Sequence, residues 1–415
     1  SDWQQKEYLC RWRTMKEYRG LLEKSKPAVN VLPLIGHRNI RVATIGYQHR
    51  PAVPSELTGM KTLLKEALNE GGRGLSTGLI YAPASSADTD EISSLAKIVK
   101  RHDGIYTTHM RNEGSALISS IKETLEIAAR TGVKTQVSHL KASGKDNWNL
   151  ISGALELIED ARGKGIEIAA DRYPYTAGYT DLDIVLPAWA QEGGRDDTLE
   201  RLNHTPTLTR IHHELTTMRK PEDWAYITIG STSHPDNLRF QGCRLTEAAR
   251  QLDLDPVSTI LHIIRNDRLQ TTAFFFGLSD KNMFQVISKP YVMVGTDASL
   301  RTPGGRLGKD FPHPRAYGSF PEYLQLYRKH NLGPLEEAIR KITSLPSEHF
   351  GIKKRGELKV GNFADIVILK PDKFLPHSDY SNPHQLATGI QHLFVNGSHT
   401  IKNGKLLPDR NGFVL

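Results

Sequence analysis

The chain has 415 residues, of which 38% are hydrophobic and 24% are charged, a composition typical of folded globular proteins and not of disordered ones. The net charge is +8, but the basic residues are scattered, so the sequence indicates no nucleic-acid-binding arm and is compatible with a small anionic substrate. Two cysteines and no membrane-length apolar stretch argue against a disulfide scaffold or a membrane protein and favour a reducing, cytoplasmic location.

Residues 29–172 alternate between short β-branched runs and longer segments of helical periodicity, which predicts successive βα units around a parallel sheet. We expect strands near 29–37, 74–81, 104–110, 133–140 and 166–175, with helices between them. The segment 177–288 is less regular and predicts an insertion of mixed structure, placed to act as a lid. A strand returns at 291–299, and short strands with glycine turns beyond 352 predict a separate small β unit.

Three polar side chains end predicted strands. His109 and His139 end consecutive strands, and Asp297 ends the strand at 291–299. The carboxyl ends of parallel strands meet at one mouth of an α/β barrel, where active sites lie. Two imidazoles and a carboxylate suit Zn²⁺, which takes nitrogen and oxygen ligands and leaves a position for water. Zinc would activate that water and polarise a carbonyl, and Asp297 would move the proton.

Each of these residues also has an ordinary structural explanation. A histidine at a strand end is commonly a hydrogen-bonded structural residue. The aspartate of "GTD" can cap the segment that follows it. Arg111 and Lys141, each two residues after a histidine, can be plain surface charges. Spacing alone therefore leaves both interpretations open.

A set of motifs, in this order along the chain, resembles the N-acyl-D-amino-acid deacylases (D-aminoacylases) of the amidohydrolase superfamily. The motifs are "GLSTGLIYAPA", "YTTHMRNEG", "SHLKASG", "DRYPYTAGYT", "VGTDAS", "HPRAYGSFP", "ITSLPSEHFGI" and "RGELKVGNFADIVIL". The stretch "NVLPLIGHRNIR" is similar to the third barrel strand of that family. The resemblance implies a (β/α)8 TIM-type barrel over 12–350, with about six of its eight strands in this chain, and part of a small β-sandwich domain over 351–415.

The same resemblance implies zinc-dependent hydrolysis of the amide bond of N-acyl-D-amino acids. His109 and His139 match the zinc histidines of the family, and Asp297 matches its catalytic acid/base. Tyr81 and Tyr173 match residues that line the acyl and carbonyl side of the pocket.

The resemblance also implies how the substrate is held. Lys141 and Arg315 match cations that bind the substrate α-carboxylate, and a planar guanidinium can do so with two hydrogen bonds. Tyr179 stands where the family more usually has serine or another small residue. It could narrow the pocket, reach a substrate group with its hydroxyl, or pack on the insertion, so the side-chain preference stays open.

Two parts of the family pattern are missing. No pair among the seventeen histidines forms the H-x-H motif of strand one, and neither Cys10 nor Cys243 falls where the family has its cysteine ligand. The chain could be a piece of a larger polypeptide, a subunit whose partner brings strands one and two, or a homologue that has lost metal chemistry. We favour the first two because every other matched site residue is present at once.

Two rival functions stay in view. A cyclic-amide hydrolase would bridge two metals with a carboxylated lysine, and no lysine stands at a predicted strand end. A non-catalytic or partner-dependent subunit could keep the pocket for an anionic small molecule. Metal content separates these possibilities, because only the enzymes need a bound metal.

Overall fold

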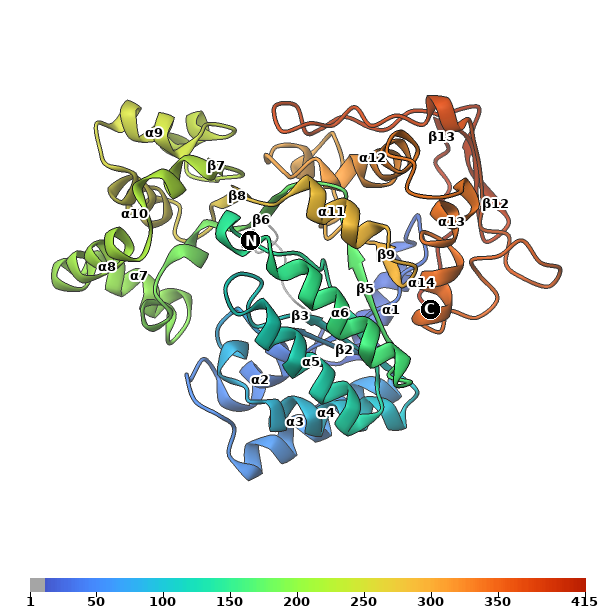
Figure 1. The fold of residues 1–415 in the computed structure, drawn as a ribbon, viewed down its shortest axis with the longest axis horizontal. Helices are drawn as coiled ribbons and strands as arrows, with labels where there is room; N and C mark the ends of the chain where they lie inside the picture. The colour runs from blue at the N-terminus through green and yellow to red at the C-terminus, as the bar shows by residue number, and fades with distance from the viewer. Residues whose placement is uncertain (1–11) are drawn as a thin grey trace.

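The computed structural model describes residues 12–415, apart from the side chain of Arg306, so Cys10 lies outside the described residues. The main sheet has six parallel strands in the order β1-β2-β3-β4-β5-β9 (Figure 1). These strands are β1 Ile35–Gly36, β2 Gly74–Gly78, β3 Ile105–His109, β4 Lys134–Val137, β5 Ile168–Arg172 and β9 Val292–Val294. The expectation of six barrel strands in this chain is confirmed.

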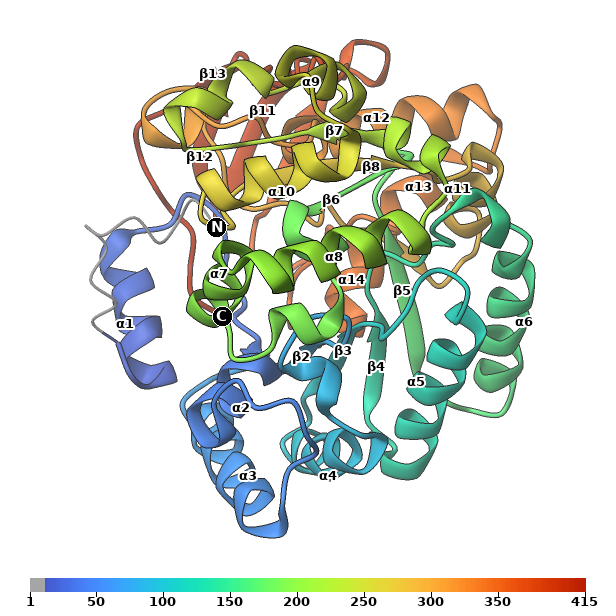
Figure 2. The same ribbon diagram turned by 90° about the vertical axis from the view of Figure 1, so that its left-hand side faces the viewer.

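Helices follow the strands on the outer face of the sheet, and Figure 2 shows α5 and α6 beside β4 and β5. They are α2 His37–Ile45, α3 Pro54–Asn69, α4 Thr89–Arg101, α5 Leu117–Thr131, α6 Leu150–Gly163 and, before β9, α11 Asp280–Ile287. Helix α4 shows why they form here. Its apolar residues Ile92, Leu95, Ala96 and Val99 are buried at helical spacing, and Asp88 caps the free N–H of Glu91.

The first strand is shorter than the sequence predicts. Strand β1 has two residues, and helix α2 begins directly at His37. Pro33 lies within the apolar run that we expected to form the strand, and proline cannot donate a hydrogen bond to a strand ladder. Val31 accordingly forms only an isolated bridge, to Val414 near the end of the chain.

The insertion forms a body of its own beside the mouth of the sheet, at the upper left of Figure 1. Its antiparallel sheet has the order β6-β8-β7. Its elements are β6 Ala177–Asp181, α7 Arg195–Asn203, α8 Thr205–Met218, β7 Ile227–Ile229, α9 Leu245–Leu252, α10 Pro256–Asn266 and β8 Thr272–Phe276. The buried apolar side chains of the segment from Leu182 to Ala273 form a separate hydrophobic core that holds the insertion together. Helix α11, in contrast, packs on β5 and β9 of the main sheet.

The C-terminal part is a second antiparallel sheet, reached from β9 through three helices. The helices are α12 Arg315–Lys329, α13 Leu335–Arg340 and α14 Ser344–His349, and the strands are β10 Ile366–Leu369, β11 Ile390–Val395, β12 Ser398–Lys402 and β13 Lys405–Leu406. This sheet leaves apolar side chains in solvent, among them Val367 at 51% and Leu406 at 74% exposure. It has the strand content of the expected small β unit but little buried face of its own.

The six-stranded sheet is open within the described part of the chain. There β1 pairs only with β2, and β9 pairs only with β5. An eight-stranded barrel needs two more strands between these edges. None of the helices formed by residues 12–415, including α1 Met15–Ser25, combines the length and apolar character that a bilayer crossing requires.

Candidate active site

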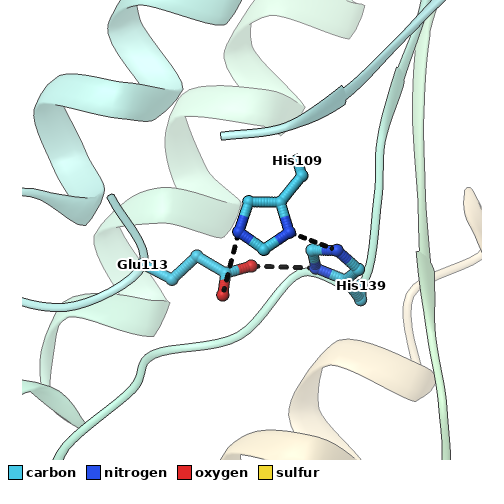
Figure 3. Close-up of side chains that lie close together, drawn as sticks. All are labelled: His109, Glu113 and His139. Atoms are coloured by element: carbon cyan, nitrogen blue, oxygen red, sulfur yellow. Dashed lines mark hydrogen bonds and ion pairs between the residues drawn. The ribbon is translucent and has the colours of Figure 1, made fainter. Parts of the chain in front are cut away.

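The two predicted metal ligands meet at the carboxyl edge of the main sheet. His109 is the last residue of β3, and His139 follows β4 by two residues. Nδ1 of His109 lies 2.8 Å from Nε2 of His139 (Figure 3). His139 has a φ of +40° and Asp297 one of +47°, a left-handed conformation that is uncommon outside glycine and that concentrates at functional sites.

Glu113 completes this cluster from the segment between β3 and α5. Its Oε1 lies 2.8 Å from Nδ1 of His139 and accepts a hydrogen bond of 2.6 Å from Nζ of Lys141. Its Oε2 lies 3.9 Å from Nε2 of His109 (Figure 3). No role was predicted for Glu113. It lies four residues after His109 in the motif "YTTHMRNEG", but neither the spacing nor the motif indicates that its side chain faces both histidines.

The cluster fits a zinc ion. One potential ligand atom from each of His109, Glu113 and His139 lies within 4.8 Å of the others. Nε2 of His109 is buried without a hydrogen-bond partner and faces Oε2 of Glu113 at 3.9 Å, which leaves Nδ1, the nitrogen nearest His139, for a metal. Burial lowers the pKa of His109 to about 3, so at neutral pH its ring is uncharged and has a lone pair for a metal. Zinc accepts imidazole nitrogen at about 2.0–2.1 Å, which allows one ion to contact two nitrogens this close together.

Glu113 and Lys141 form a pair of opposite charges beside the histidines. Burial raises the pKa of Glu113, but the charge of Lys141 and the interactions with His139 outweigh it, and the pKa lies well below its usual value. Glu113 is therefore an ionised carboxylate at 7% exposure beside a lysine at 8% exposure. A buried pair of this kind is tolerated because each charge neutralises the other.

Asp171 and Gln136 hold the turn that carries His139. Oδ1 of Asp171 accepts a hydrogen bond of 2.8 Å from the backbone N–H of His139, and Oδ2 accepts one of 2.7 Å from Gln136. Burial raises the pKa of Asp171. This contact fixes the left-handed turn after β4 against the neighbouring strand β5. Sequence patterns did not identify these roles, because Asp171 acts on the backbone of His139 and Gln136 acts on Asp171, contacts that no spacing or motif specifies.

The predicted acid/base pairs with a predicted substrate cation. Oδ2 of Asp297 lies 2.7 Å from Nη1 of Arg315, and 39% of the Asp297 side chain is accessible. Desolvation raises the pKa of Asp297, but His139, Arg315 and Lys141 outweigh it and the pKa is lowered. Both residues line a cavity of about 170 Å³ at the boundary with the insertion. Its other lining residues include Tyr179, Thr180, Ser299 and His313.

The remaining predicted cation and one tyrosine lie deeper. Tyr173 is 1% exposed, and its ring centre lies 4.7 Å from Cζ of Arg315 and 5.9 Å from Nζ of Lys141. The ammonium of Lys141 is directed to Glu113 and does not line the cavity. Tyr173 thus lies between the two cations that the sequence assigned to the substrate carboxylate, but only Arg315 reaches the cavity.

Tyr81 connects the histidine pair to the cavity. Its ring centre lies 5.1 Å from that of His109, and its hydroxyl lies 3.2 Å from Oγ1 of Thr180, which lines the cavity. Burial raises the pKa of Tyr81 to about 12. The hydroxyl therefore keeps its proton at neutral pH and can donate a hydrogen bond to an oxygen between the histidines and the cavity.

Tyr179 lines the cavity and also packs on the insertion. Its hydroxyl lies 2.6 Å from Oγ1 of Thr272 and 3.0 Å from Oγ of Ser231, and it donates to the carbonyl of Phe311 at 3.0 Å. These contacts orient the ring along the cavity wall. Of the three roles that the sequence left open, narrowing the pocket and packing on the insertion both agree with this position.

Comparisons with known proteins show similarity over most of this chain. The Amidohydrolase family profile matches residues 6–407. An N-acyl-D-glutamate deacylase of Alcaligenes xylosoxydans xylosoxydans is 31% identical over 92% of this chain and 69% of its own, and a D-aminoacylase of the same organism is 30% identical over 94% and 70%. The structure of an N-acyl-D-glutamate deacylase from Bordetella bronchiseptica, complexed with zinc and a phosphonate inhibitor, is similar with a TM-score of 0.80, 28% identity and coverage of 97% and 75%.

Proposed function

Because the chain belongs to the amidohydrolase family, and within it to the D-aminoacylases, we propose that it removes the acyl group from N-acyl-D-amino acids by zinc-dependent hydrolysis. The single observation that carries the proposal is the pair of imidazole nitrogens 2.8 Å apart at the carboxyl edge of the parallel sheet. The deacylase names of the relatives support the substrate class.

The residues divide the chemistry among them. His109 and His139 would hold zinc, which supplies a Lewis acid for the amide carbonyl and lowers the pKa of water. Arg315 binds the substrate α-carboxylate with two hydrogen bonds, which places the amide at the mouth of the sheet. Tyr81 donates a hydrogen bond to the oxygen that becomes negative when water adds to the carbonyl. Asp297 accepts the proton of the water and returns it to the nitrogen as the C–N bond breaks.

The test is a hydrolysis assay with matched substrates. N-acetyl-D-leucine, N-acetyl-D-glutamate and N-acetyl-L-leucine are incubated with the protein, and the released amine is measured. We expect hydrolysis of the D substrates, loss of activity after treatment with a chelator and recovery with zinc. Equal rates for both enantiomers would contradict the D preference, and full activity in the chelated protein would contradict the metal-dependent mechanism.

We also propose how the site is completed. The free edges of β1 and β9 would accept two further strands that bring the missing H-x-H and cysteine ligands, from an N-terminal segment or from a second polypeptide. Covered edges are the rule for stable sheets, which supports this arrangement. Native mass spectrometry identifies the source of these strands. A second polypeptide adds its own mass to the complex, whereas an N-terminal segment increases the mass of the chain itself. A cytoplasmic location remains part of the proposal, supported by Cys243, which is free.

A further inference from the structure

We propose that Glu113 is a positioning residue that fixes the ring orientation and the tautomer of His139 and faces the outer nitrogen of His109, without binding the metal itself. The proposal deepens the proposed function, because it takes His109 and His139 as the zinc ligands. It assigns a role to a buried carboxylate that lies in the motif "YTTHMRNEG" but has no part in the proposed catalytic steps.

One ring nitrogen of each histidine faces the other histidine, and the second ring nitrogen of each faces Glu113. Nδ1 of His109 and Nε2 of His139 face each other at 2.8 Å, so these two atoms are placed to share one ion. The other nitrogen of each ring points to Glu113, with Nδ1 of His139 at 2.8 Å and Nε2 of His109 at 3.9 Å (Figure 3). A carboxylate behind a metal-binding imidazole orients the ring and makes it a better ligand.

One carboxylate oxygen of Glu113 already has two interaction partners. Oε1 of Glu113 already lies 2.6 Å from Nζ of Lys141 and 2.8 Å from Nδ1 of His139. Binding a metal through this oxygen would break both contacts and leave the ammonium of Lys141 buried without its counter-charge, a costly change. As an outer partner of the rings, Glu113 keeps both contacts.

Hydrogen bonds hold the backbone turn that carries Glu113 in place. The backbone carbonyl of Glu113 accepts a hydrogen bond of 2.7 Å from the N–H of Ser143, in the segment that follows Lys141. The side chain of Asn112 accepts hydrogen bonds from the N–H groups of Gly114 and Ala116. The turn before α5 is therefore tied to the turn after β4, and Glu113 reaches His139 from a fixed position.

Lys141 contacts the same nitrogen of His139 as Glu113 does and would favour the opposite tautomer. Its Nζ lies 2.9 Å from Nδ1 of His139, and an ammonium can only donate. If Lys141 determines the tautomer, Nδ1 carries a lone pair and Nε2 carries the proton. If Glu113 determines it, Nδ1 carries the proton and Nε2 is free for the metal. We assign the second state, because Lys141 has two other acceptors, Oε1 of Glu113 and the carbonyl of His139 at 3.2 Å.

The test reads the tautomer directly in the metal-free protein. Long-range ¹H–¹⁵N correlation spectra of ¹⁵N-histidine-labelled protein distinguish the two neutral tautomers, and the His139 signals are identified by their loss in His139→Asn. We expect the Nδ1–H form of His139 in the unmodified protein and in Glu113→Gln, whose amide oxygen still accepts. In Glu113→Ala we expect the Nε2–H form, because Lys141 becomes the remaining partner of Nδ1.

A second readout is the zinc dissociation constant, measured by competition with a chromophoric chelator. We expect binding about 10–100-fold weaker in Glu113→Ala, the usual effect of removing a carboxylate behind a ligand, with partial recovery in Glu113→Gln. The matched control is Glu123→Gln. Glu123 is also an ion-paired glutamate and is largely buried, at 14% exposure, but it contacts Arg111 at 2.8 Å and neither histidine. Its variant should keep the His139 tautomer and the zinc affinity.

The outcomes separate this proposal from the proposed function. An Nε2–H His139 in the unmodified protein overturns the role of Glu113, even if the protein binds zinc and is active. The His139 tautomer of the unmodified protein tests the role of Glu113 even if Glu113→Ala does not fold. Unchanged zinc affinity in a folded Glu113→Ala overturns it as well. An Nδ1–H His139 in an active protein supports both proposals, whereas the same tautomer in a protein that hydrolyses no acylated amino acid contradicts the proposed function alone.

Discussion

Nη1 of Arg315 lies 2.7 Å from Oδ2 of Asp297, so the guanidinium assigned to the substrate is paired with the carboxylate assigned to the proton. Both side chains line the same cavity. A substrate carboxylate that binds Arg315 therefore competes with Asp297 for the same hydrogen-bond donors. Because Arg315 contributes to the lowered pKa of Asp297, weakening this pair raises that pKa. Substrate binding thus makes the Asp297 carboxylate a stronger base for the proton of the water.

Substitution Asp297→Asn is expected to lower kcat by about 10²–10⁴-fold, because an amide cannot carry the proton between water and the leaving nitrogen. Kinetic assays with N-acetyl-D-leucine give kcat, and circular dichroism checks the fold. Asp372→Asn is the matched control, since Asp372 also pairs with an arginine but is exposed and does not line the cavity. Near-normal activity in a folded Asp297→Asn would remove Asp297 from the mechanism.

Substitution Arg315→Lys is expected to raise KM by about 10-fold or more with a smaller effect on kcat. Lysine keeps the positive charge but cannot form two parallel hydrogen bonds to a carboxylate. The measurement is KM for N-acetyl-D-leucine, compared with Arg328→Lys, which changes an exposed ion pair. An unchanged KM would mean that the substrate carboxylate is held elsewhere, with Lys141 as the next candidate.

Substitution Tyr81→Phe is expected to lower kcat by about 10²–10³-fold with little change in KM, because a donor to a developing negative oxygen acts mainly in the transition state. The ring against His109 is kept, and only the hydroxyl contact with Thr180 is lost. Tyr226→Phe, at a position 50% exposed, is the control. If KM rises and kcat is unchanged, Tyr81 contributes to ground-state binding instead.

The unfolding free energy is expected to fall as the pH drops below about 6.5. Burial lowers the pKa of His349 to about 4 from its usual value of 6.5. The unfolded chain takes up a proton on this residue between these two values and the folded chain does not, so stability present above pH 6.5 is lost as the pH falls through 4. Urea unfolding of the chelated protein at several pH values measures the slope.

The variant His349→Gln isolates this contribution. We expect a shallower decrease of the unfolding free energy between pH 6.5 and pH 4 than in the unmodified protein. Above pH 7 the two proteins should show parallel pH dependences, because His349 is then neutral in both the folded and the unfolded state. An identical slope below pH 6.5 would assign the acid sensitivity to other buried groups, such as His313, whose pKa burial also lowers.

Some details of the fold could not be predicted from local patterns. The sequence predicted a strand over 29–37, whereas β1 is limited to Ile35–Gly36, because Pro33 interrupts the ladder. The mixed segment was predicted to extend to 288, but α11 packs on β5 and β9. Helical periodicity identifies a buried face without saying which sheet it covers.

The sequence by itself determined the strand order and the residues at the strand ends. Alternating strand and helix patterns give a parallel sheet, and parallel strands all end at the same edge. His109 and His139 therefore had to meet once both were assigned to strand ends. Only the tertiary structure decided which side chains complete the site. The contacts of Glu113 with His139, of Lys141 with Glu113 and of Arg315 with Asp297 depend on how loops fold back over the sheet, and residue spacing does not specify those paths.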